Sequence, residues 1–350
     1  MTREENHGNG QGAPARLVVR APNWLGDAVL ALPALRAVGR RFADSEVTLA
    51  ATPAVAPLFA ESVGLDGWST LVLPDGRRAQ VAALAAGRFD AGLLLTNSFG
   101  SAWALRRAAV PGRWGYRSDL RRWLLTRSVG RPRGRVHQAD YYRSLVAGLG
   151  IEPDTGPPRL MVSDRTGRRA GEVLARVGWS GGPLVGLAPG AAYGHAKRWP
   201  PARAAELVAR LVAEHDVSCV LLGARGDRDA GRAIESSLAG GRTARGRVLN
   251  LIGQTDLTQA MGVMARCRAF VSNDSGAMHV AAALGLPVTA IFGPTDERVT
   301  APVGPHEVLV HQVFCRPCML RECPIDHRCM KRITTDQVLA AVARQLGAGR

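Results

Sequence analysis

The sequence predicts an α/β protein made of two Rossmann-like domains that face each other across a cleft. Three observations lead to this prediction. The 350 residues, 46% of them hydrophobic, are too many for one comfortable core and suit two domains. Short apolar strands alternate with helices of ordinary length, which is typical of a parallel sheet. Polar, glycine-rich corners follow several strands, at the ends where such sheets bind ligands.

The first predicted domain covers residues 16–158. It opens with a strand at 17–20, and the loop APNWLGD leads to a helix over about residues 28–41. Three more strands and a later helix are predicted at 46–52, 69–74, 89–97 and 137–150. The βαβ alternation implies a parallel sheet.

The second predicted domain covers residues 159–333 and shows the same alternation more clearly. The helix at 200–215 carries proline in its first turn, and Asp256 is expected to cap a later helix. The expected strands are 183–190, 217–224, 247–253, 269–273 and 287–293. The other expected helices begin at 227, 256 and 276.

The two ends and the middle of the chain have compositions of their own. Residues 1–15 are polar, lack the apolar segment of a secretory signal, and predict a disordered tail of a cytoplasmic protein. Proline and glycine at 153–158 indicate the approach to a linker between the domains. A C-terminal helix is expected within 334–350.

The charge balance implies an acidic partner. The formal net charge is +16, from 45 Lys and Arg against 29 Asp and Glu. A nucleotide, a nucleic acid or an anionic membrane surface would fit this charge. Aromatic residues make up only 5%, without the alternation with arginine of an RNA-binding module, so nucleic acid is not expected. No apolar run approaches about 18 residues, so no transmembrane span is predicted.

Four polar corners at strand ends predict a site for a nucleotide diphosphate. The corner at 273–276 starts a helix, whose first amides and dipole favour an anion. The loop at 190–199 adds a Lys-Arg pair, and the corners at 223–227 and 293–296 complete the set. Ordinary capped helices and solvated basic loops are the alternative for each corner taken alone.

The chain resembles the ADP-heptose:lipopolysaccharide heptosyltransferases, glycosyltransferase family 9, over roughly residues 16–345. The resemblance rests on RAPNWLGDAVLALPALRAV, APGAAYGHAKRWP and NDSGAMHVAAALGLPVTAIFGPTD. The segments LLTNSFGSAWALRRAAVPGRWGYRSDLRRWLLT and VHQADYYRSLVAGLG are similar to the heptosyltransferase II subgroup. Several long motifs in the right order are more specific than any single glycine-rich loop.

The resemblance implies a GT-B glycosyltransferase, with the acceptor mostly on the first domain and the nucleotide sugar on the second. The implied reaction is inverting transfer of L-glycero-D-manno-heptose from ADP-heptose to the lipopolysaccharide inner core, without a divalent metal. The implied acceptor is Kdo-lipid A, with the second heptose step favoured. The enzyme would be cytoplasmic and peripheral at the anionic inner face of the inner membrane.

The resemblance makes Asp27 the catalytic base. From the residues alone, an aspartate at this point is more often a helix cap. Gly26 would allow a substrate to approach closely, and Asn23 can hydrogen-bond sugar hydroxyls. Trp24 would stack on a sugar or pack against the helix.

The donor side is expected to use residues from three corners. The resemblance assigns Lys197 and the amides of the corner at 275–277 to the diphosphate, and Asp274 to the heptose hydroxyls. His279 lies one helical turn beyond Ser275 and either supports the phosphate or only packs. Asp227 would bind ribose or cap its helix. The expected donor residues are Lys197, Asp227, Asp274, Ser275, Gly276, Ala277 and His279.

The first domain carries a cluster of arginines that would meet the acidic acceptor and the anionic membrane surface. Solubilising charge is the alternative for each arginine taken alone. The cluster comprises Arg106, Arg107, Arg113, Arg117, Arg121 and Arg122, of which Arg113, Arg117 and Arg121 are the expected acceptor ligands.

Four of the six cysteines lie in the segment 315–329, CRPCMLRECPIDHRC. The opening C-x2-C is zinc-like, but the later spacings of Cys315, Cys318, Cys323 and Cys329 are not those of a standard pair of zinc knuckles. A structural metal, packed thiols and disulfides all remain open, and a reducing compartment disfavours the disulfides.

Three functions remain as alternatives to the favoured one. A related GT-B enzyme would use another nucleotide sugar or acceptor. A heptosyltransferase I would carry out the first heptose step. A protein of another class would keep the fold only to bind nucleotides, without catalysis.

Overall fold

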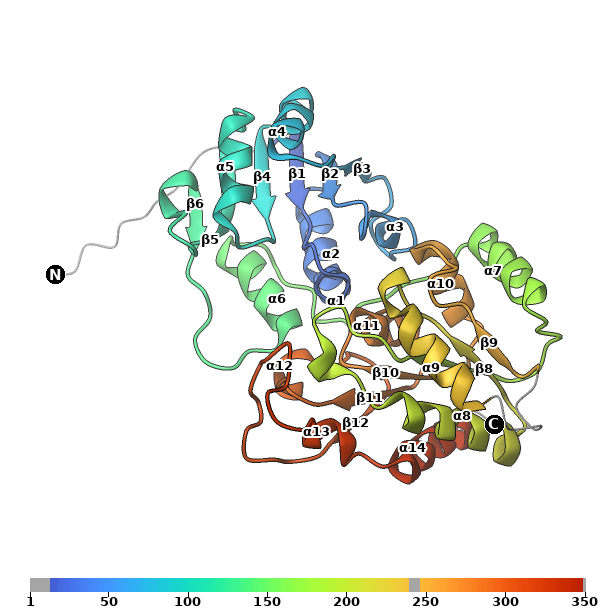
Figure 1. The fold of residues 1–350 in the computed structure, drawn as a ribbon. Coiled ribbons are helices and arrows are strands. Elements are labelled where there is room, and N and C mark those ends of the chain that lie inside the picture. The colour runs from blue at the N-terminus through green and yellow to red at the C-terminus, as the bar shows by residue number, and fades with distance from the viewer. Residues whose placement is uncertain (1–12, 239–245, 349–350) are drawn as a thin grey trace.

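The computed structural model describes residues 13–238 and 246–348 and contains two parallel sheets of six strands each (Figure 1). The strand order of the first sheet is β3-β2-β1-β4-β5-β6, with every pair parallel. Its strands are β1 (Arg16–Arg20), β2 (Glu46–Ala51), β3 (Ser69–Val72), β4 (Ala91–Leu94), β5 (Gly112–Tyr116) and β6 (Arg127–Val129).

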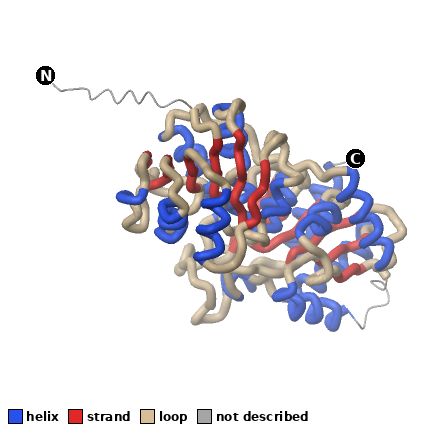
Figure 2. Tube along the Cα trace, turned by 90° about the horizontal axis from the view of Figure 1, so that it is seen from above, coloured by secondary structure: helices blue, strands red, loops and turns tan. Residues whose placement is uncertain are grey.

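The second sheet repeats the strand order of the first. Its order is β12-β11-β10-β7-β8-β9. Read from β9, this is β9-β8-β7-β10-β11-β12, the same order as in the first sheet read from β3. Its strands are β7 (Leu184–Ala188), β8 (Ser218–Leu221), β9 (Val248–Asn250), β10 (Ala269–Asn273), β11 (Val288–Phe292) and β12 (His306–Val310). The predicted fold class of two Rossmann-like halves is confirmed, and Figure 2 shows both sheets surrounded by helices.

The helices of the first half correct one expectation. The single helix expected over about residues 28–41 is two helices, α1 (Leu25–Leu30) and α2 (Leu32–Arg41). Pro33 explains the break, because proline has no N–H with which to continue the hydrogen-bond ladder of α1. The remaining helices are α3 (Ala56–Phe59), α4 (Arg77–Ala86), α5 (Phe99–Arg107) and α6 (Gln138–Gly148), with a 3-10 turn η1 (Arg122–Leu124).

The helices of the second half mostly follow the sequence pattern. Asp256 caps α10 as expected, and Gln259 completes a capping box with it. The C-terminal helix is α14, and residues 349–350 of that prediction lie outside the described residues. The helices are α7 (Asp164–Arg176), α8 (Pro201–His215), α9 (Arg228–Leu238), α10 (Leu257–Met264), α11 (Gly276–Ala283), α12 (Glu297–Thr300), α13 (Arg328–Lys331) and α14 (Thr335–Ala348).

The expected tail at 1–15 is mostly outside the described residues, since the structure describes the chain from residue 13 and β1 begins at Arg16. No helix in the described part of the chain is both long and apolar enough to cross a membrane.

Three apolar clusters fill the molecule, and the middle one belongs to both halves. Alternate residues of β1 point to opposite faces, so Leu17 and Val19 join the middle cluster and Val18 joins the one under α4 and α5. The middle cluster runs from α2 and α6 to α7, α10 and α11 of the second half. A third cluster lies under α8 and α14. The two halves therefore share one continuous core along their contact.

The connection between the halves, residues 149–163, is fixed to the first half. Asp154 lies 2.8 Å from Arg36 Nε and 3.0 Å from Arg40 Nη1, both on α2. Farther along, Glu61 of the first half accepts hydrogen bonds from Ser163 and Thr166 at the start of α7. The boundary proposed at residue 158 falls between these two anchors.

Candidate active site

The two halves meet where α1 follows β1 and α11 follows β10. A methyl group on Gly26 would lie 2.7 Å from Cδ2 of His279, and one on Gly276 would lie 2.8 Å from Cβ of Leu25. Only glycine allows this approach of the two helix starts. The space that the sequence analysis gave to a substrate at Gly26 is filled here by the imidazole of His279, so the glycine serves the contact between the halves.

Asp27 lies on α1 beside this contact and is partly buried. Burial raises the pKa of its carboxyl group from 3.8 to about 6, and the nearby charge of Lys197 partly opposes the rise. The pKa of the Tyr142 hydroxyl is well above its ordinary value, mainly because the side chain is buried and secondly because the Asp27 carboxylate is near. A carboxyl group with a pKa near 6 suits a general base at neutral pH.

Lys197 of the second half is paired with Asp274. Its Nζ lies 2.5 Å from Oδ2 of Asp274, and both side chains are nearly buried, with exposed fractions of 11% and 6%. Thr295 donates its hydroxyl to the same carboxylate oxygen at 2.5 Å. The ring of Tyr193 lies 4.6 Å from Lys197 Nζ and further fixes the ammonium group. The structure thus brings residues of three predicted corners into direct contact, and Asp227 of the fourth lies against the loop that carries Lys197.

At the start of α11, the N-cap side chain accepts no hydrogen bond from the first backbone amides of the helix. Ser275 is the N-cap, but its hydroxyl pairs with that of Ser272 at 3.1 Å. The amides of Gly276 and Ala277 therefore stand at the helix start, next to the Lys197–Asp274 pair. Such amides, with the helix dipole, favour an anion.

His279 is buried in α11, and burial lowers the pKa of its imidazole to about 4. The ring is therefore neutral at physiological pH. Its Nδ1 has no hydrogen-bond partner among the described residues. Its packing against Gly26 matches the simpler of the two roles considered from the sequence.

Asp227 holds two loops together. Its carboxylate accepts from the amide of Ala224 at 3.1 Å and from Arg198 at 3.4 Å. A methyl group on Gly190 would lie 2.1 Å from its Cγ, so the carboxylate is pressed against the loop after β7. This is the capping role that the sequence analysis weighed against a ribose contact.

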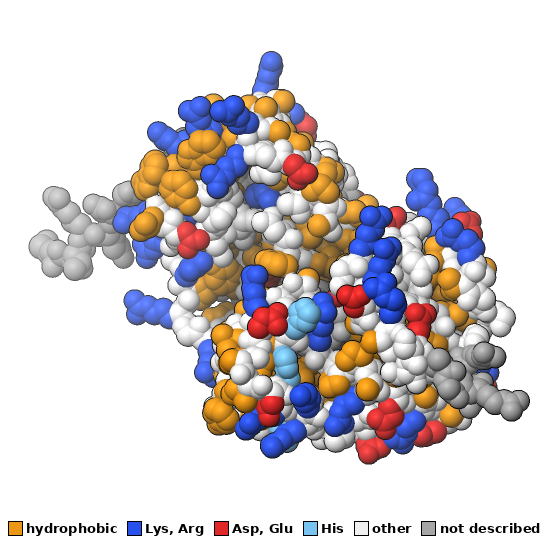
Figure 3. All heavy atoms as spheres, viewed as in Figure 1, with side chains coloured by type: hydrophobic (Ala, Val, Ile, Leu, Met, Phe, Trp, Pro, Cys, Tyr) orange, Lys and Arg blue, Asp and Glu red, His pale blue; other side chains and the backbone are white. Residues whose placement is uncertain are grey.

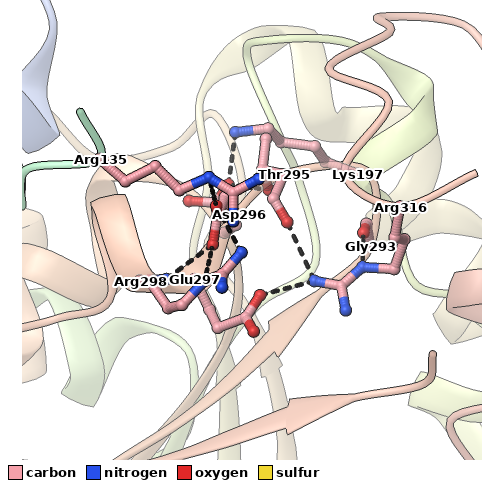
Figure 4. A network of polar contacts seen from close by, with 9 residues as sticks. Arg135, Lys197, Gly293, Thr295, Asp296, Glu297, Arg298 and Arg316 are labelled. Carbon is pink, nitrogen blue, oxygen red and sulfur yellow. Dashed lines mark hydrogen bonds and ion pairs between the residues drawn. The ribbon is translucent and has the colours of Figure 1, made fainter.

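The cysteine-rich segment braces the donor corners. Arg316 is 3% exposed and donates to the carbonyls of Gly293 and Thr295 and to the carboxylate of Glu297 (Figure 4). The carbonyl of Arg321 accepts from the amide of Ala196, next to Lys197. The segment therefore fixes both the corner at 293–296 and the loop that carries Lys197.

All six cysteines are free thiols, with Cys315, Cys318 and Cys323 partly exposed and Cys329 buried. Within residues 13–238 and 246–348, no group of three or more His, Cys, Asp or Glu side chains is placed to hold a metal ion. The structural zinc considered for Cys315, Cys318, Cys323 and Cys329 is therefore unsupported, and of these four thiols only that of Cys329 is buried.

A cavity of about 330 Å³ opens at the carboxyl ends of the first sheet. Its basic and polar lining comes from the ends of β1, β2 and β4 and from the first turns of α4 and α5. Asn23 is part of this lining, and its side-chain oxygen accepts from Arg20 at 2.6 Å. The polar lining residues are Arg20, Asn23, Thr52, Arg77, Gln80, Thr96, Ser98 and Ser101.

Two of the three arginines expected to bind the acceptor have internal roles. Arg121 is fully buried and donates to the carbonyls of Tyr116, Thr96 and Ser98. Arg113 donates to three carbonyls within residues 110–124. The expectation that Arg121 faces an acceptor is wrong, because its donors fold the loop onto the start of α5. Arg117 is exposed, and so is Trp24, which is 55% exposed at the start of α1.

Two further contacts cross between the halves. Arg135 lies 3.6 Å from the carboxylate of Asp296, as Figure 4 shows, and Nε2 of His137 lies 2.9 Å from the carbonyl of Ala301. Arg135, His137 and Arg316 were not among the predicted site residues, and of the cavity lining only Asn23 was. Thr295 and Asp296 lie in the predicted corner at 293–296. The lining was within reach, because Thr52, Arg77 and Thr96 follow strand ends just as the donor corners do. No local pattern distinguishes Arg316, because its partners, two backbone carbonyls and the carboxylate of Glu297, lie about 20 residues away in the sequence.

Comparisons with known proteins agree on one family. Residues 77–328 match the family model described as glycosyltransferase family 9 (heptosyltransferase). Lipopolysaccharide heptosyltransferase 2 of Escherichia coli strain K12 is 32% identical over 303 residues, covering 82% of this chain and 85% of that protein. Lipooligosaccharide heptosyltransferase 2 of Haemophilus ducreyi is 29% identical over 318 residues, covering 85% and 89%.

Solved structures give the same result. The structure of E. coli ADP-heptose lps heptosyltransferase II matches with a TM-score of 0.80 and 28% identity, over 95% of this chain and 99% of that one. E. coli heptosyltransferase WaaC with ADP shares the fold at a TM-score of 0.71 and 19% identity, over 94% of this chain and 99% of that one.

Proposed function

The chain belongs to glycosyltransferase family 9, the heptosyltransferases, and on that premise we propose that it transfers heptose from ADP-heptose to the lipopolysaccharide inner core. Family membership makes it an enzyme, which sets aside the alternative of a nucleotide-binding protein without catalysis. The observation that carries the proposal is the meeting of α1 and α11. There, a carboxyl group with a raised pKa lies beside an anion-binding helix start and a lysine.

Asp27 is the general base of the proposed reaction. Above pH 6 its carboxylate takes the proton of the acceptor hydroxyl as that oxygen attacks the anomeric carbon of the heptose. The bond from the anomeric carbon to the diphosphate oxygen breaks, and the centre inverts through an oxocarbenium-like state. ADP leaves with the bonding electron pair.

The second half stabilises the leaving diphosphate. Lys197 and the amides of Gly276 and Ala277 direct positive charge to the place where negative charge grows. These fixed charges supply what a divalent metal supplies elsewhere, and the proposed reaction is metal-independent. Asp274 orients Lys197 and is the proposed contact for the hydroxyls of the heptose.

The first half takes the acceptor. The cavity at the ends of β1, β2 and β4 presents Arg20 and Arg77 with neutral hydrogen-bonding groups between them. This lining suits an acidic sugar, because guanidinium groups bind carboxylates and phosphates in pairs of hydrogen bonds. Kdo sugars of the inner core have that chemistry, and a Kdo-lipid A glycan is the proposed acceptor.

The second heptose step is favoured over the first. The heptosyltransferases 2 of E. coli and H. ducreyi match over 82% and 85% of this chain. A heptosyltransferase 1, from Pseudomonas aeruginosa, matches over only 36% of this chain. Another nucleotide sugar is the remaining alternative, because none of the proposed donor residues is assigned to the base.

The experiment measures ADP release from purified protein in EDTA. The substrates are ADP-heptose and Kdo-lipid A, with or without one heptose already attached. Release that requires the heptose-bearing acceptor supports the second step, and release with the bare Kdo acceptor moves the enzyme to the first step. The Asp27→Asn variant should lose at least about a hundredfold in kcat, as expected when a general base is removed.

Asp229→Asn is the matched control, because Asp229 is an exposed acid on α9. The control should keep full activity. Absence of ADP release from the wild type with either acceptor would overturn the heptose assignment. Activity of Asp27→Asn equal to that of the control would remove Asp27 as the base.

A further inference from the structure

The start of α5 and the loop before β6 expose three large apolar side chains. Leu120 is 90% exposed, Trp123 is 64% exposed and Phe99 is 39% exposed. The rings of Phe99 and Trp123 lie 5.9 Å apart and form one surface, and Leu120 belongs to the same short segment between β5 and β6 as Trp123. We call these three residues the apolar patch. Large exposed apolar side chains that gather in one place mark an interaction surface.

The backbone holds the patch outward. Asp119 and Leu120 both have left-handed conformations, with φ of 48° and 56°. Residues with side chains adopt this region reluctantly, and a bulky one least of all. Buried Arg121 fixes the loop by donating to the carbonyls of Thr96 and Ser98, directly before Phe99. The fold therefore maintains a strained turn whose result is an exposed leucine.

Positive charge surrounds the patch. From residue 99 to residue 133 the chain carries nine arginines and a single acidic residue, Asp119. Of these arginines, Arg113 and Arg121 donate to carbonyls within the first half. Arg107 and Arg122 are exposed, as are Arg106 and Arg117. Figure 3 shows blue side chains around orange ones at the upper left of the molecule, over α5 and the segment before β6.

We propose that the apolar patch and its arginines dock the enzyme on an anionic phospholipid bilayer, with Leu120 and Trp123 entering the interface. Tryptophan favours the level of the lipid headgroups, and arginines next to it bind anionic headgroups. Apolar insertion combined with a basic rim is the pattern of proteins that lie on a membrane surface.

The position of the patch fits the direction from which a lipid-anchored acceptor arrives. Ser98, Gly100 and Ser101 line the 330 Å³ cavity, while Phe99 in the same turn belongs to the patch. A glycan anchored in the docked bilayer would therefore emerge next to the cavity. The arrival of a lipid-anchored acceptor rests on the proposed function, whereas the docking surface does not.

The test is flotation of the full-length protein with vesicles of phosphatidylethanolamine and phosphatidylglycerol. Leu120→Ser/Trp123→Ser should bind these vesicles at least about tenfold more weakly than the wild type, because two inserted apolar side chains are lost. Arg107→Gln/Arg122→Gln should weaken binding to these vesicles, and the wild type should bind phosphatidylcholine vesicles poorly.

Phe314→Ser is the matched control. Phe314 is an aromatic side chain next to an arginine, Arg328, and is 80% exposed. It lies on the second half, away from the apolar patch. It should bind vesicles as the wild type does. Unchanged vesicle binding by the Leu120/Trp123 variant, or an equal loss in Phe314→Ser, would overturn the proposal. A wild type that self-associates through the patch while ignoring vesicles would also overturn it, in favour of contact with a second copy.

Activity separates this proposal from the proposed function. With an acceptor stripped of its acyl chains, the Leu120/Trp123 variant should release ADP at the wild-type rate. With the intact acceptor in vesicles, its rate should fall by about the same factor as its vesicle binding. Vesicle binding that depends on the patch, together with no ADP release from the wild type, would sink only the heptosyltransferase assignment.

Discussion

Asp27 combines a proposed catalytic role with an unfavourable environment for its charge. Its folded-state pKa of about 6 lies above the ordinary 3.8, so folding favours the protonated form. The resulting penalty is absent below pH 3.8, grows up to pH 6, and is constant above that. Asp27→Asn should therefore unfold at a higher temperature than the wild type at pH 8, with a gain of about 1–2 kcal/mol.

The gain should disappear at pH 4, where the wild-type carboxyl group is also neutral in the folded protein. Thermal unfolding of both proteins at pH 8 and pH 4 checks this. A destabilised Asp27→Asn at pH 8 would show that the carboxylate is well solvated or well paired after all.

The same pKa sets the pH dependence of the reaction. A base must be ionised to act, so kcat/KM should rise about tenfold per pH unit below pH 6 and level off above it. A pH profile measured with the acyl-free acceptor tests this directly. A profile that is flat between pH 5 and pH 8 would be incompatible with Asp27 as the base.

Lys197 and Asp274 form a nearly buried pair, and removing one partner should cost more than removing both. Lys197→Met leaves the Asp274 carboxylate with Thr295 but without its cation, at an expected cost of about 3 kcal/mol. Lys197→Met/Asp274→Leu should recover most of that stability and still lack activity. Urea unfolding of the single and double variants measures the cycle, and additive losses would argue against a coupled pair.

At the scale of the element, the contact between α1 and α11 depends on two glycines. Gly276→Ala places a methyl group 2.8 Å from Leu25 Cβ, so the two helix starts must move apart. We expect a loss of about 1–3 kcal/mol in stability and a large fall in kcat, because the base and the donor site separate.

Gly167→Ala is the control for that variant. Gly167 lies within α7, and the space around its Cα is open, so alanine should be neutral or slightly stabilising there. Unchanged kcat in Gly276→Ala would show that the alignment of α1 and α11 tolerates a shift.

Helices and strands were predictable from sequence where the apolar pattern and the flanking turn or capping residues agree. The strands β7 and β11 are short apolar runs bounded by proline or glycine, and β8 and β10 are apolar runs that lead into glycine-containing corners. Asp256 marks the start of α10. The strands β5, β6 and β12 were not predicted. Two glycines interrupt the five residues of β5, and the edge strands β6 and β12 carry polar residues. The burial of Arg121 was not predictable either, since nothing in the local sequence distinguishes a buried arginine from an exposed one.

At the scale of the whole molecule, Asp154 joins the connection between the halves to α2. The hydrogen bond from Arg36 holds the pKa of its carboxyl group well below its ordinary value. A lowered pKa means that the ion pair stabilises the fold above about pH 4 and fades as the pH falls below it. Asp154→Asn should lose about 2 kcal/mol at pH 7 and differ less from the wild type at pH 3.

Asp326→Asn is the control, because Asp326 also pairs with an arginine but lies exposed. It should change stability little at either pH. Equal losses in the two variants would show that the anchoring of the connection contributes nothing beyond a surface ion pair.

The architecture of two facing sheets was predictable from the alternation of strands and helices, and the family from long motifs. The tight contact of the halves was not, because sequence periodicity shows which face of a helix is apolar but not what covers it. Gly26 illustrates this limit. Its sequence context suggested room for a substrate, whereas its neighbour is His279 from the other half.

The core that the halves share has a consequence for how the chain emerges from the ribosome. The first sheet and its helices are complete once α6 ends at Gly148. Their apolar face is covered only when α11, which begins at Gly276, packs against it. Roughly 130 residues must still be synthesised, which takes on the order of ten seconds in bacteria. During that interval the nascent protein displays an uncovered apolar surface, which makes it a natural client for chaperones and exposes it to misassembly.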